Sequence, residues 1–407
     1  MPKINYDVCI VGAGAAGIAV ASSLLKRQPQ LQIALIEPSK THAYQPGWTL
    51  VGAGIFSQQQ TLRSTQSVMP KAVTWIQDAA AEFQAAQNRV ILESGATVEY
   101  RALVVAPGLK LDFEAIEGLT ETLGQHGVTS NYRVDLAPYT WQLVQELQQG
   151  TALFTQPPMP IKCAGAPQKA LYLSSDWWQQ RGTLSNIDVA FHNAGGLLFG
   201  VPAYVPALMD TVSGYAIDLQ LNSQLVKVDG PNKIATFNLI KDGAVVGQEN
   251  KTFDMLHVCP PQTAHDFMQD QPICDAAGWV KVNQESLQNP DFPNVFGLGD
   301  GANTPNAKTA AAVRKQAPVV AKNLLSMLAQ QPLTASYDGY GSCPLTVSRS
   351  RIVLAEFGYG GKLLPTFPKW LLDGTRPTRS AWWLKAKAMP TIYWQLMLKG
   401  REWLTKP

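Results

Sequence analysis

Hydrophobic positions along the chain occur mainly in short, nearly unbroken runs. Residues 7–11, 102–106 and 294–298 are such runs, and each leads directly into a turn that contains glycine. Runs of this length bounded by turn residues predict strands that are buried on both faces of a parallel sheet. Residues 18–26 instead predict a helix, and residues 32–36 predict a second strand. This alternation of strands and helices predicts an α/β fold.

The same pattern restarts near residue 150. Residues 151–155 predict a strand, residues 167–180 a helix and residues 187–192 another strand. A chain of 407 residues is expected to form two or three domains. We therefore predict two Rossmann-like domains and a C-terminal region. The predicted boundaries are 1–115 together with 285–332 for the first domain, 116–284 for the second domain and 333–407 for the C-terminal region.

A glycine motif follows the first predicted strand. Gly12, Gly14 and Gly17 form the pattern G-x-G-x-x-G, and Glu37 ends the next strand 20 residues after Gly17. The first glycine makes a tight turn, the second lets the backbone approach a pyrophosphate, and the third permits close helix packing. The helix N-terminus stabilises the phosphates, and the acid accepts hydrogen bonds from a ribose hydroxyl. This context predicts a bound dinucleotide rather than a glycine-rich turn without a ligand.

Two further segments bear on which dinucleotide is bound. Residues 102–108 and 294–300 resemble signature segments of the glutathione-reductase-like flavoprotein superfamily. The resemblance implies that the dinucleotide is FAD and that Asp300 contacts the flavin ribityl chain. It also implies a helix from about Ala307 whose positive end, with Lys308, stabilises negative charge on the reduced flavin. The alternative for Lys308 is an ordinary exposed helix lysine.

The second domain lacks a nicotinamide-binding motif. A relative that uses NAD(P)H would carry another G-x-G-x-x-G here, but residues 193–200 read NAGGLLFG and contain bulky apolar residues. The first strand of this domain leads instead toward Cys163. The sequence therefore argues against NADH as the electron donor.

Cysteine usage favours redox chemistry over metal binding. The five cysteines have neither metal-ligand spacing nor a dense disulfide pattern, which favours a reducing compartment and no metal site. Cys163 precedes Pro167, a suitable first-turn helix residue, and Lys162 and Lys169 lie close to it in sequence. A helix N-terminus and nearby lysines favour the reactive thiolate. Cys343 follows two glycines in a predicted turn that could expose it.

The remaining cysteines are expected to be inert. An isolated cysteine is usually a small buried hydrophobic residue. Cys9 lies in the first predicted strand, and Cys259 follows a strand and precedes two prolines. We apply the same interpretation to Cys274.

Several segments together resemble the sulfide:quinone oxidoreductase family, in the branch that contains the mitochondrial enzyme and its bacterial relatives. They extend over nearly the whole chain, and the two cysteine segments are the most specific of them: residues 42–54, 162–169, 255–258, 275–280, 308–313 and 337–340. The resemblance implies that Cys163 and Cys343 form a disulfide, or a sulfur-bridged form of it, beside the flavin. The residues expected to bind FAD are Gly12, Gly14, Ala15, Ala16, Gly17, Glu37, Pro38, Gln45, Pro46, Ala106, Pro107, Gly108, Gly299, Asp300, Lys308 and Thr309.

The resemblance also implies a reaction sequence. Sulfide attacks the bridge at Cys343 and leaves a persulfide there, and Cys163 leaves as a thiolate that passes electrons to the flavin through a transient adduct. The sulfur then passes to an acceptor, and quinone removes the two electrons. Such exchange requires an accessible sulfur and a stabilised leaving thiolate. Other branches carry a third redox cysteine that has no counterpart here, so the sulfur product and its acceptor stay open.

The end of the chain has a composition of its own. Residues 361–407 contain nine Lys/Arg and two Asp/Glu, against 24 and 28 in the first 360 residues, and five of the 11 tryptophans. Aromatic rings mixed with basic residues suit a membrane interface, although a tail packed on the core with ordinary surface lysines is the alternative. No run is long enough to span a membrane. Because the family places quinone near this end, Phe357, Tyr393 and Trp394 are candidate quinone-wall residues.

These observations predict an FAD-dependent, monotopic enzyme that oxidises sulfide and reduces quinone on the cytoplasmic side of the inner (plasma) membrane, with no nucleic-acid partner. No signal peptide is expected. A single-subunit NADH:quinone oxidoreductase and a non-catalytic flavin-based sulfide or persulfide sensor remain alternatives. A flavocytochrome-type sulfide dehydrogenase subunit would normally carry an export signal. The quinone type and a homo-oligomeric state stay open, and non-covalent FAD is expected because no cysteine lies in residues 44–49.

Overall fold

The computed structural model describes residues 5–405. Its first sheet has the order β5-β2-β1-β8-β7-β6, with β19 beside β8. Strands β5, β2, β1, β8 and β19 are parallel, so β1 lies in the middle of the sheet and both its faces are buried. The strands of this sheet are β1 (Asn5–Val11), β2 (Ile33–Ile36), β5 (Val73–Ile76), β6 (Ala80–Gln84), β7 (Arg89–Leu92), β8 (Thr97–Val105) and β19 (Val295–Gly297).

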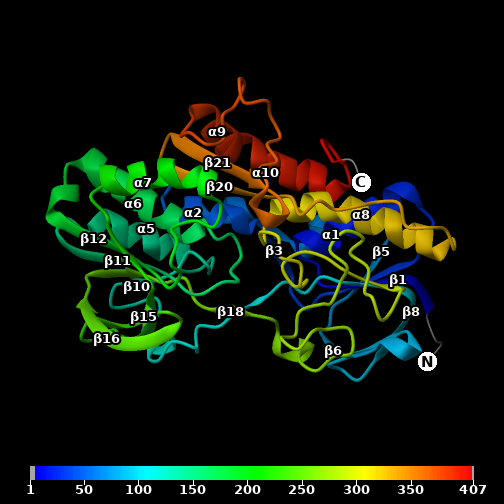
Figure 1. The fold of residues 1–407 in the computed structure, drawn as a ribbon. Helices are drawn as coiled ribbons and strands as arrows, with labels where there is room; N and C mark the ends of the chain where they lie inside the picture. Colours follow the sequence, from blue (N-terminus) through cyan, green and yellow to red (C-terminus); the bar gives the residue numbers. More distant parts are fainter. Residues whose placement is uncertain (1–4, 406–407) are drawn as a thin grey trace.

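Two helices cover one face of this sheet. Helix α1 (Ala15–Arg27) follows the glycine motif and packs beside α8 (Ala310–Leu328), which comes late in the chain (Figure 1). The predicted helix at residues 18–26 is confirmed, whereas α8 begins three residues after Ala307. Its N-cap is Thr309, whose hydroxyl accepts a hydrogen bond from the Ala312 amide at 3.2 Å.

The second domain is built on a five-stranded parallel sheet of order β10-β17-β11-β12-β13. Helices cover one face, and an antiparallel sheet packs on the other (Figure 1). The parallel strands are β10 (Val128–Thr129), β11 (Gly150–Gln156), β12 (Ile187–Asn193), β13 (Asp218–Leu221) and β17 (Met255–His257). The helices are α5 (Ala137–Glu146), α6 (Ala166–Arg181) and α7 (Val205–Gly214), and the antiparallel strands are β14 (Ser223–Asp229), β15 (Ile234–Lys241) and β16 (Ala244–Thr252).

The chain returns to the first domain earlier than the predicted residue 285. Ala264, Met268 and Val280 are buried in the hydrophobic core around β1 and β8. The crossing point is marked by the short strands β9 (Lys110–Leu111) and β18 (Gln262–Thr263), which pair with each other. The other short elements are β3 (Thr41–Ala43), β4 (Leu62–Ser64), α2 (Trp48–Val51), α3 (Thr65–Val68) and α4 (Leu119–Thr122).

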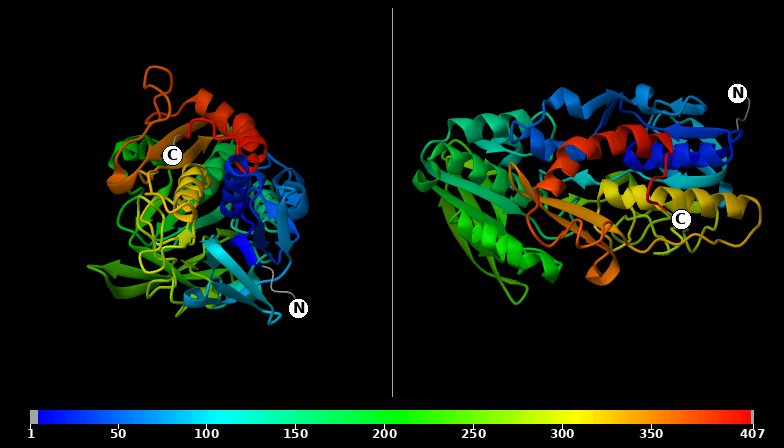
Figure 2. Two further views of the ribbon diagram at one scale, coloured as in Figure 1. Left: turned by 90° about the vertical axis from the view of Figure 1, so that its right-hand side faces the viewer. Right: turned by 90° about the horizontal axis from the view of Figure 1, so that it is seen from above.

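The C-terminal region consists of an antiparallel hairpin and a helical segment. The hairpin is β20 (Gly341–Ser348) and β21 (Arg351–Phe357), and the helical segment runs from α9 (Arg379–Trp383) through α10 (Met389–Thr391) to residue 399. Figure 2 shows this segment beside α1 and α8, on top of the first domain. Within residues 5–405, no helix is long and apolar enough to cross a membrane.

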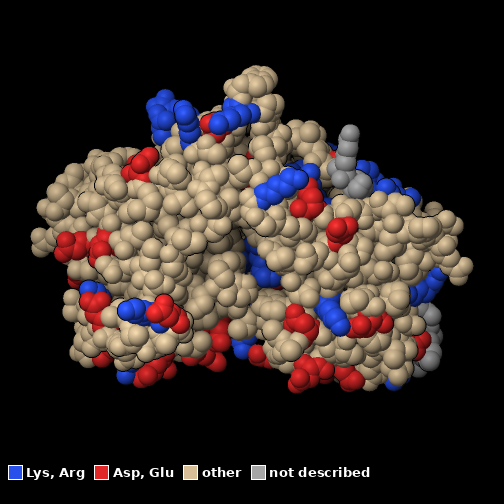
Figure 3. Space-filling view, viewed as in Figure 1, with Lys and Arg blue, Asp and Glu red and all other residues tan. Residues whose placement is uncertain are grey.

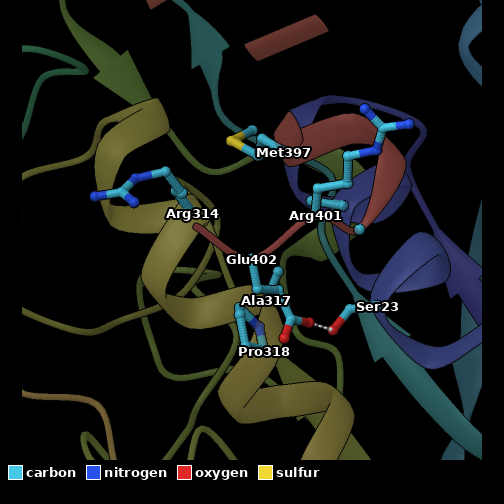
Figure 4. A pocket seen from close by; sticks show the side chains of 9 residues that line it. Ser23, Arg314, Ala317, Pro318, Met397, Arg401 and Glu402 are labelled. Atoms are coloured by element: carbon cyan, nitrogen blue, oxygen red, sulfur yellow. Dashed lines mark hydrogen bonds between the residues drawn. The ribbon is translucent and has the colours of Figure 1, made fainter. Parts of the chain in front are cut away.

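The end of the chain is fixed to the first domain by a partly buried ion pair. Glu402 accepts hydrogen bonds from Ser23 Oγ at 2.6 Å and from both terminal nitrogens of Arg27 at 2.5 and 2.9 Å. Figure 4 shows the Glu402 carboxylate facing Ser23 where the tail passes between α1 and α8. Ser22 adds a hydrogen bond from its hydroxyl to the Leu398 carbonyl at 2.7 Å. These contacts place the C-terminal segment over the first domain.

Candidate functional site

One large cavity of about 540 Å³ lies where the two domains and the C-terminal region meet. It contains the glycine motif, the start of α8, Cys163 at the start of α6, the hairpin and the C-terminal helical segment. Every residue expected to bind FAD lines this cavity except Gly17 and Pro38.

The glycine loop is shaped by close backbone approach. Gly12 has φ +96°, and a Cβ on it would lie 2.4 Å from the Ala106 carbonyl oxygen at the end of β8. A Cβ on Gly17 would lie 1.8 Å from the Gly12 carbonyl, so Gly17 permits packing beneath the loop and does not face the cavity. Gly14 has open space above it. Gly12 and Gly17 therefore have the turn and packing roles that the spacing predicts, and the space above Gly14 leaves room for a ligand.

Glu37 holds the loop in place. One carboxylate oxygen accepts a hydrogen bond from the Ala13 amide and the other from the Ser39 amide, both at 2.8 Å. Carboxylate oxygens have further lone pairs, and the side chain lines the cavity. Glu37 can therefore accept hydrogen bonds from a ribose while it fixes the loop.

Four buried polar side chains that line the cavity have unsatisfied atoms, one of them Ser342 on the hairpin and the other three in the first and second domains. Trp48 Nε1, Thr49 Oγ1 and both amide atoms of Asn131 lack hydrogen-bond partners within the protein. Buried polar groups are nearly always paired, so these atoms indicate a polar ligand. A long cavity with a pyrophosphate-type loop at one end and these groups further along fits a flavin dinucleotide. Sequence reasoning missed Asn131, which lies two residues after β10 in the second domain.

Lys308 is buried, so its interpretation as an exposed helix lysine is wrong. Its ammonium donates to the carbonyl oxygens of Asp300 and Ala302 at 2.7 and 2.9 Å and lies 4.6 Å from the centre of the Trp279 ring. Burial lowers the pKa of Lys308, opposed by the charge of Asp300. Burial likewise raises the pKa of Asp300, opposed by Lys308 and Lys162. The pair places compensating charges in the cavity wall.

Cys163 lies in a tight turn just before α6. Its φ is +52°, its amide donates to the Lys308 carbonyl at 2.9 Å, and Pro167 occupies the first turn of the helix. The ammonium of Lys169, one turn into α6, lies 3.0 Å from the Cys163 sulfur. Lys162 points away from the sulfur, donating to Gln45 Oε1 at 2.8 Å. Of the two lysines that the sequence indicates, only Lys169 contacts the sulfur.

Cys343 is not in an exposed turn, as predicted, but inside strand β20, where it is completely buried. Gly341 and Pro344 gave the segment a turn-like sequence, but pairing with β21 and packing against α6 stabilise a strand. A Cβ on Gly165 would lie 3.7 Å from the Cβ of Cys343, so the hairpin brings Cys343 up to the Cys163 turn. The fold thus brings together two cysteines 180 residues apart, here as free thiols.

The two sulfurs have opposite electrostatic properties. Interaction with the Cys343 thiol lowers the pKa of Cys163 well below its usual range, and the charge and hydrogen bond of Lys169 lower it further, against the effect of burial. The same interaction and burial raise the pKa of Cys343. Cys163 is therefore the thiolate of the pair. Burial raises the pKa of Cys259 and Cys274 to about 12 and that of Cys9 further, which fits inert thiols.

The C-terminal segment contributes a buried lysine that the sequence did not single out. Lys385 is 2 % exposed, lines the cavity and donates to the Pro46 carbonyl at 2.8 Å. Burial, and next the charge of Lys169, lower its pKa to about 7. It interacts electrostatically with both cysteines, so two lysines act on the thiolate site.

Among the candidate quinone-wall residues, only Tyr393 lines the cavity. Its hydroxyl donates to His42 Nε2 at 2.7 Å, because His42 Nδ1 bonds the Ala13 carbonyl at 3.0 Å. Trp394 is buried behind it against Arg63. Phe357 faces Phe199 of the second domain, with ring centres 5.9 Å apart. The structure does not bring Phe357 and Trp394 to the cavity.

Comparison with known proteins gives concordant results. The family model for pyridine nucleotide-disulphide oxidoreductase matches residues 6–148. Mitochondrial sulfide:quinone oxidoreductase of Mus musculus is 39% identical over 98% of this chain and 87% of its own length. The crystal structure of sulfide:quinone oxidoreductase from Aquifex aeolicus superposes with a TM-score of 0.79 at 21% identity, covering 97% of this chain and 92% of that one. A chain in the Tetrahymena thermophila mitochondrial ATP synthase structure superposes with a TM-score of 0.85 at 23% identity, covering 98% and 97%.

Proposed function

Because the chain belongs to the sulfide:quinone oxidoreductase family, we propose that it oxidises sulfide at Cys163 and Cys343 and passes the electrons to a membrane quinone. Family membership implies a flavin, and we propose FAD bound non-covalently in the 540 Å³ cavity. The observation that carries the proposal is the adjacency of a buried thiol and a lysine-stabilised thiolate at the wall of that cavity. A disulfide formed by this pair is the oxidant for sulfide.

The sulfur step is a thiol–disulfide exchange. Hydrosulfide attacks the Cys343 sulfur of the disulfide, so a new S–S bond forms there as a persulfide and the Cys163–Cys343 bond breaks. Cys163 leaves as a thiolate that Lys169 stabilises, and a leaving thiol of low pKa leaves faster. Cys343 is completely buried while Cys163 lines the cavity, so the small size of hydrosulfide favours its approach to the Cys343 sulfur.

The sulfur leaves in a second exchange. A nucleophilic acceptor takes the terminal persulfide sulfur and leaves the cysteines as two thiols. Removal of two electrons and two protons from them re-forms the disulfide. Bound flavin supplies the chemistry that accepts this electron pair and releases it to quinone. Glu37, the glycine loop and Asp300 would hold the dinucleotide, and Lys308 would stabilise negative charge beside its ring.

The face above the C-terminal segment supports attachment to a membrane surface. Trp370 is 85% exposed, and Leu371 and Trp383 are also exposed. The side chains of Lys369 and Arg376 are exposed beside them. Figure 3 shows Lys and Arg gathered along this upper edge, while Asp and Glu lie mainly along the lower one. Apolar rings with basic neighbours suit anionic lipid, and binding to vesicles that contain anionic lipid tests this part of the proposal.

The deciding experiment is anaerobic mixing of the FAD-loaded protein with sulfide, and separately with NADH, while flavin absorbance is followed. We expect rapid bleaching by sulfide, loss of bleaching in Cys163→Ser and Cys343→Ser, and return of the colour on addition of decylubiquinone. Bleaching by NADH together with indifference to sulfide would instead assign an NADH:quinone oxidoreductase. Bleaching by sulfide without reoxidation by quinone would favour a sensor.

A further inference from the structure

The hairpin of β20 and β21 separates two environments. Successive side chains of a strand point to opposite faces, and Cys343 pairs with Ala355 while the neighbouring Ser342 pairs with Glu356. Cys343 and Ala355 are buried against the second domain, near Cys163. Ser342 and Glu356 must therefore lie on the other face, and both line the cavity. This alternation also explains why Phe357, adjacent to Glu356, faces the second domain.

The cavity-facing side of the hairpin meets apolar side chains of the C-terminal segment. Leu354, on this face, packs near Phe367 and Met389, and Ile392 lines the same part of the cavity. These residues come from the region that carries the exposed Trp370. The surroundings are apolar and lie under the proposed membrane-facing edge, which suits a hydrophobic ring delivered from lipid.

Ser342 is an unsatisfied hydroxyl in this apolar wall. It is 6 % exposed, and its Oγ has no hydrogen-bond partner within the protein. A buried hydroxyl without a partner is costly, so a ligand that accepts or donates a hydrogen bond there is favoured. A quinone carbonyl oxygen is such an acceptor on an otherwise apolar ring.

Glu356 connects the same wall to the surface. It is 5 % exposed and accepts hydrogen bonds from Tyr340 OH at 2.6 Å, from the Thr366 amide at 3.1 Å and from the Thr366 hydroxyl. Thr366 is half-buried and follows the exposed Pro365. The network therefore runs from a buried carboxylate that lines the cavity to a loop in contact with solvent. Glu356 is the only carboxylate among the described C-terminal residues that line the cavity.

We propose that this face of the hairpin receives the quinone head group, that the Ser342 hydroxyl donates a hydrogen bond to one quinone oxygen, and that Glu356 passes a proton to the quinone during its reduction. The inference rests on the proposed function and assigns its quinone-side residues. It moves the quinone wall from Phe357 and Trp394 to Ser342, Glu356 and their apolar neighbours.

The proton transfer balances the electron transfer. A quinone becomes a quinol by taking up two electrons, which come from the dithiol by way of the flavin, and two protons, which come from water. Glu356 takes up one proton through the hydroxyls of Thr366 and Tyr340 and releases it to a quinone oxygen, forming an O–H bond. Because Glu356 takes up and releases one proton, its protonation state is the same before and after each turnover. The second proton reaches the other oxygen from water at the open end of the cavity.

The test separates the two half-reactions in a stopped-flow instrument. Holoenzyme reduced by one equivalent of sulfide is mixed with decylubiquinone, which takes up protons, or with ferricyanide, which takes up electrons alone. We expect Ser342→Ala to raise the quinone concentration for half-maximal reoxidation about five- to tenfold, the effect of one hydrogen bond. We expect Glu356→Gln to lower the maximal rate with quinone on the order of a hundredfold.

Three controls identify the affected step. Reduction by sulfide and reoxidation by ferricyanide should stay within about twofold of wild type in both variants, since neither needs the proton. Glu356→Asp should restore part of the quinone rate. Ser350→Ala, at the exposed turn of the same hairpin, and Glu93→Gln, an exposed glutamate on the first domain, should leave the quinone rate unchanged.

The outcomes distinguish this inference from the function on which it rests. Wild-type reoxidation by quinone in both Ser342→Ala and Glu356→Gln would overturn the inference and leave the proposed function intact. Equal loss with ferricyanide and quinone would also overturn it, because the defect would then concern electron transfer or folding. Ser342→Ala removes a single oxygen and is expected to fold. If sulfide reduces the wild-type protein but quinone does not reoxidise it, the proposed function itself is ruled out.

Discussion

The ammonium of Lys169 lies 3.0 Å from the sulfur of Cys163, and the two residues are six positions apart in sequence. The contact arises because Cys163, with φ +52°, lies in the turn of residues 162–165 that precedes α6, and Lys169 lies on the first turn of that helix facing back toward it. A cation at this distance stabilises a thiolate and leaves a neutral thiol unaffected. Together with the interaction with Cys343, the contact therefore lowers the pH at which Cys163 becomes a nucleophile and a good leaving group.

We expect Lys169→Met to raise the pKa of Cys163, because one close opposite charge is lost while Cys343 and Lys385 remain. The measurement is the rate of iodoacetamide alkylation of the anaerobically reduced protein as a function of pH. Reactivity is present above the pKa and is lost as the pH falls through it, so the profile should move to higher pH. Lys162→Met is the matched control, since that ammonium contacts Gln45. Equal shifts in both variants would contradict a specific role for Lys169.

Gly165 is expected to control the approach of the two cysteines. A Cβ there would lie 2.4 Å from the Leu345 side chain and 3.7 Å from the Cβ of Cys343, so Gly165→Ala should push the hairpin away from the Cys163 turn. Overpacking of this kind costs roughly 1–3 kcal/mol of stability. The variant should also form the Cys163–Cys343 disulfide more slowly with diamide, as measured by mass spectrometry of quenched samples. Gly214→Ala, where a Cβ meets nothing within 4 Å, should oxidise at the wild-type rate.

Local sequence pattern was sufficient to predict the fold of the first domain and the surroundings of Cys163. The glycine spacing, the buried strands and Pro167 are short-range signals, and the structure places each of them as expected. The pKa-lowering role of Lys169 could also be anticipated, because a residue one turn into a helix lies near the residues that precede it. These features depend on neighbours in sequence.

The features that sequence could not provide depend on distant packing. Lysines are rarely buried, so nothing in the tail distinguishes Lys385 from its exposed neighbour Lys387 until the segment packs over the cavity. Because glycine and proline are typical of turns, Gly341 and Pro344 led to the prediction of a turn where the structure has the strand that carries Cys343. Without a predicted strand, the alternation of side chains could not be predicted either. This alternation directs Phe357 toward the second domain and Glu356 toward the cavity. The proposed quinone site therefore depends on which of two adjacent residues, Glu356 or Phe357, faces the cavity.

The contact between Glu402 and Arg27 should decide whether the end of the chain stays docked. Partial burial opposes ionisation of Glu402, but hydrogen bonds from Arg27 and Ser23 outweigh it and lower the pKa of this carboxyl. Glu402→Gln removes the charge while keeping the shape, at an expected cost of roughly 1–3 kcal/mol to docking. Trypsin should then cleave after the exposed Lys399 and Arg401 faster than in wild type. Cleavage at the wild-type rate would show that apolar packing alone fixes the tail; Glu93→Gln is the control.

Buried neutral histidines predict a loss of stability in mild acid. Burial lowers the pKa of His42, His192 and His257 to about 4 each, whereas an unfolded histidine has its usual value of 6.5. Between these values the unfolded chain binds protons that the folded chain does not, so the free energy of unfolding falls as the pH falls below 6.5. The expected loss between pH 7.5 and 5.5 is about 1.4 kcal/mol for each histidine.

Urea unfolding of the protein at pH 7.5 and 5.5 measures this loss directly. Replacing one of the three should remove its share, so the difference between the two pH values should shrink by about 1.4 kcal/mol in His192→Gln. His192 is the suitable choice because it lies in the second domain, stacked on Phe237 and away from the cavity. His126→Gln, at an exposed position, should leave the difference unchanged. An unfolding free energy that is the same at both pH values would mean that these histidines are protonated in the folded state, and that the Tyr393 hydroxyl cannot donate to His42 as the structure has it.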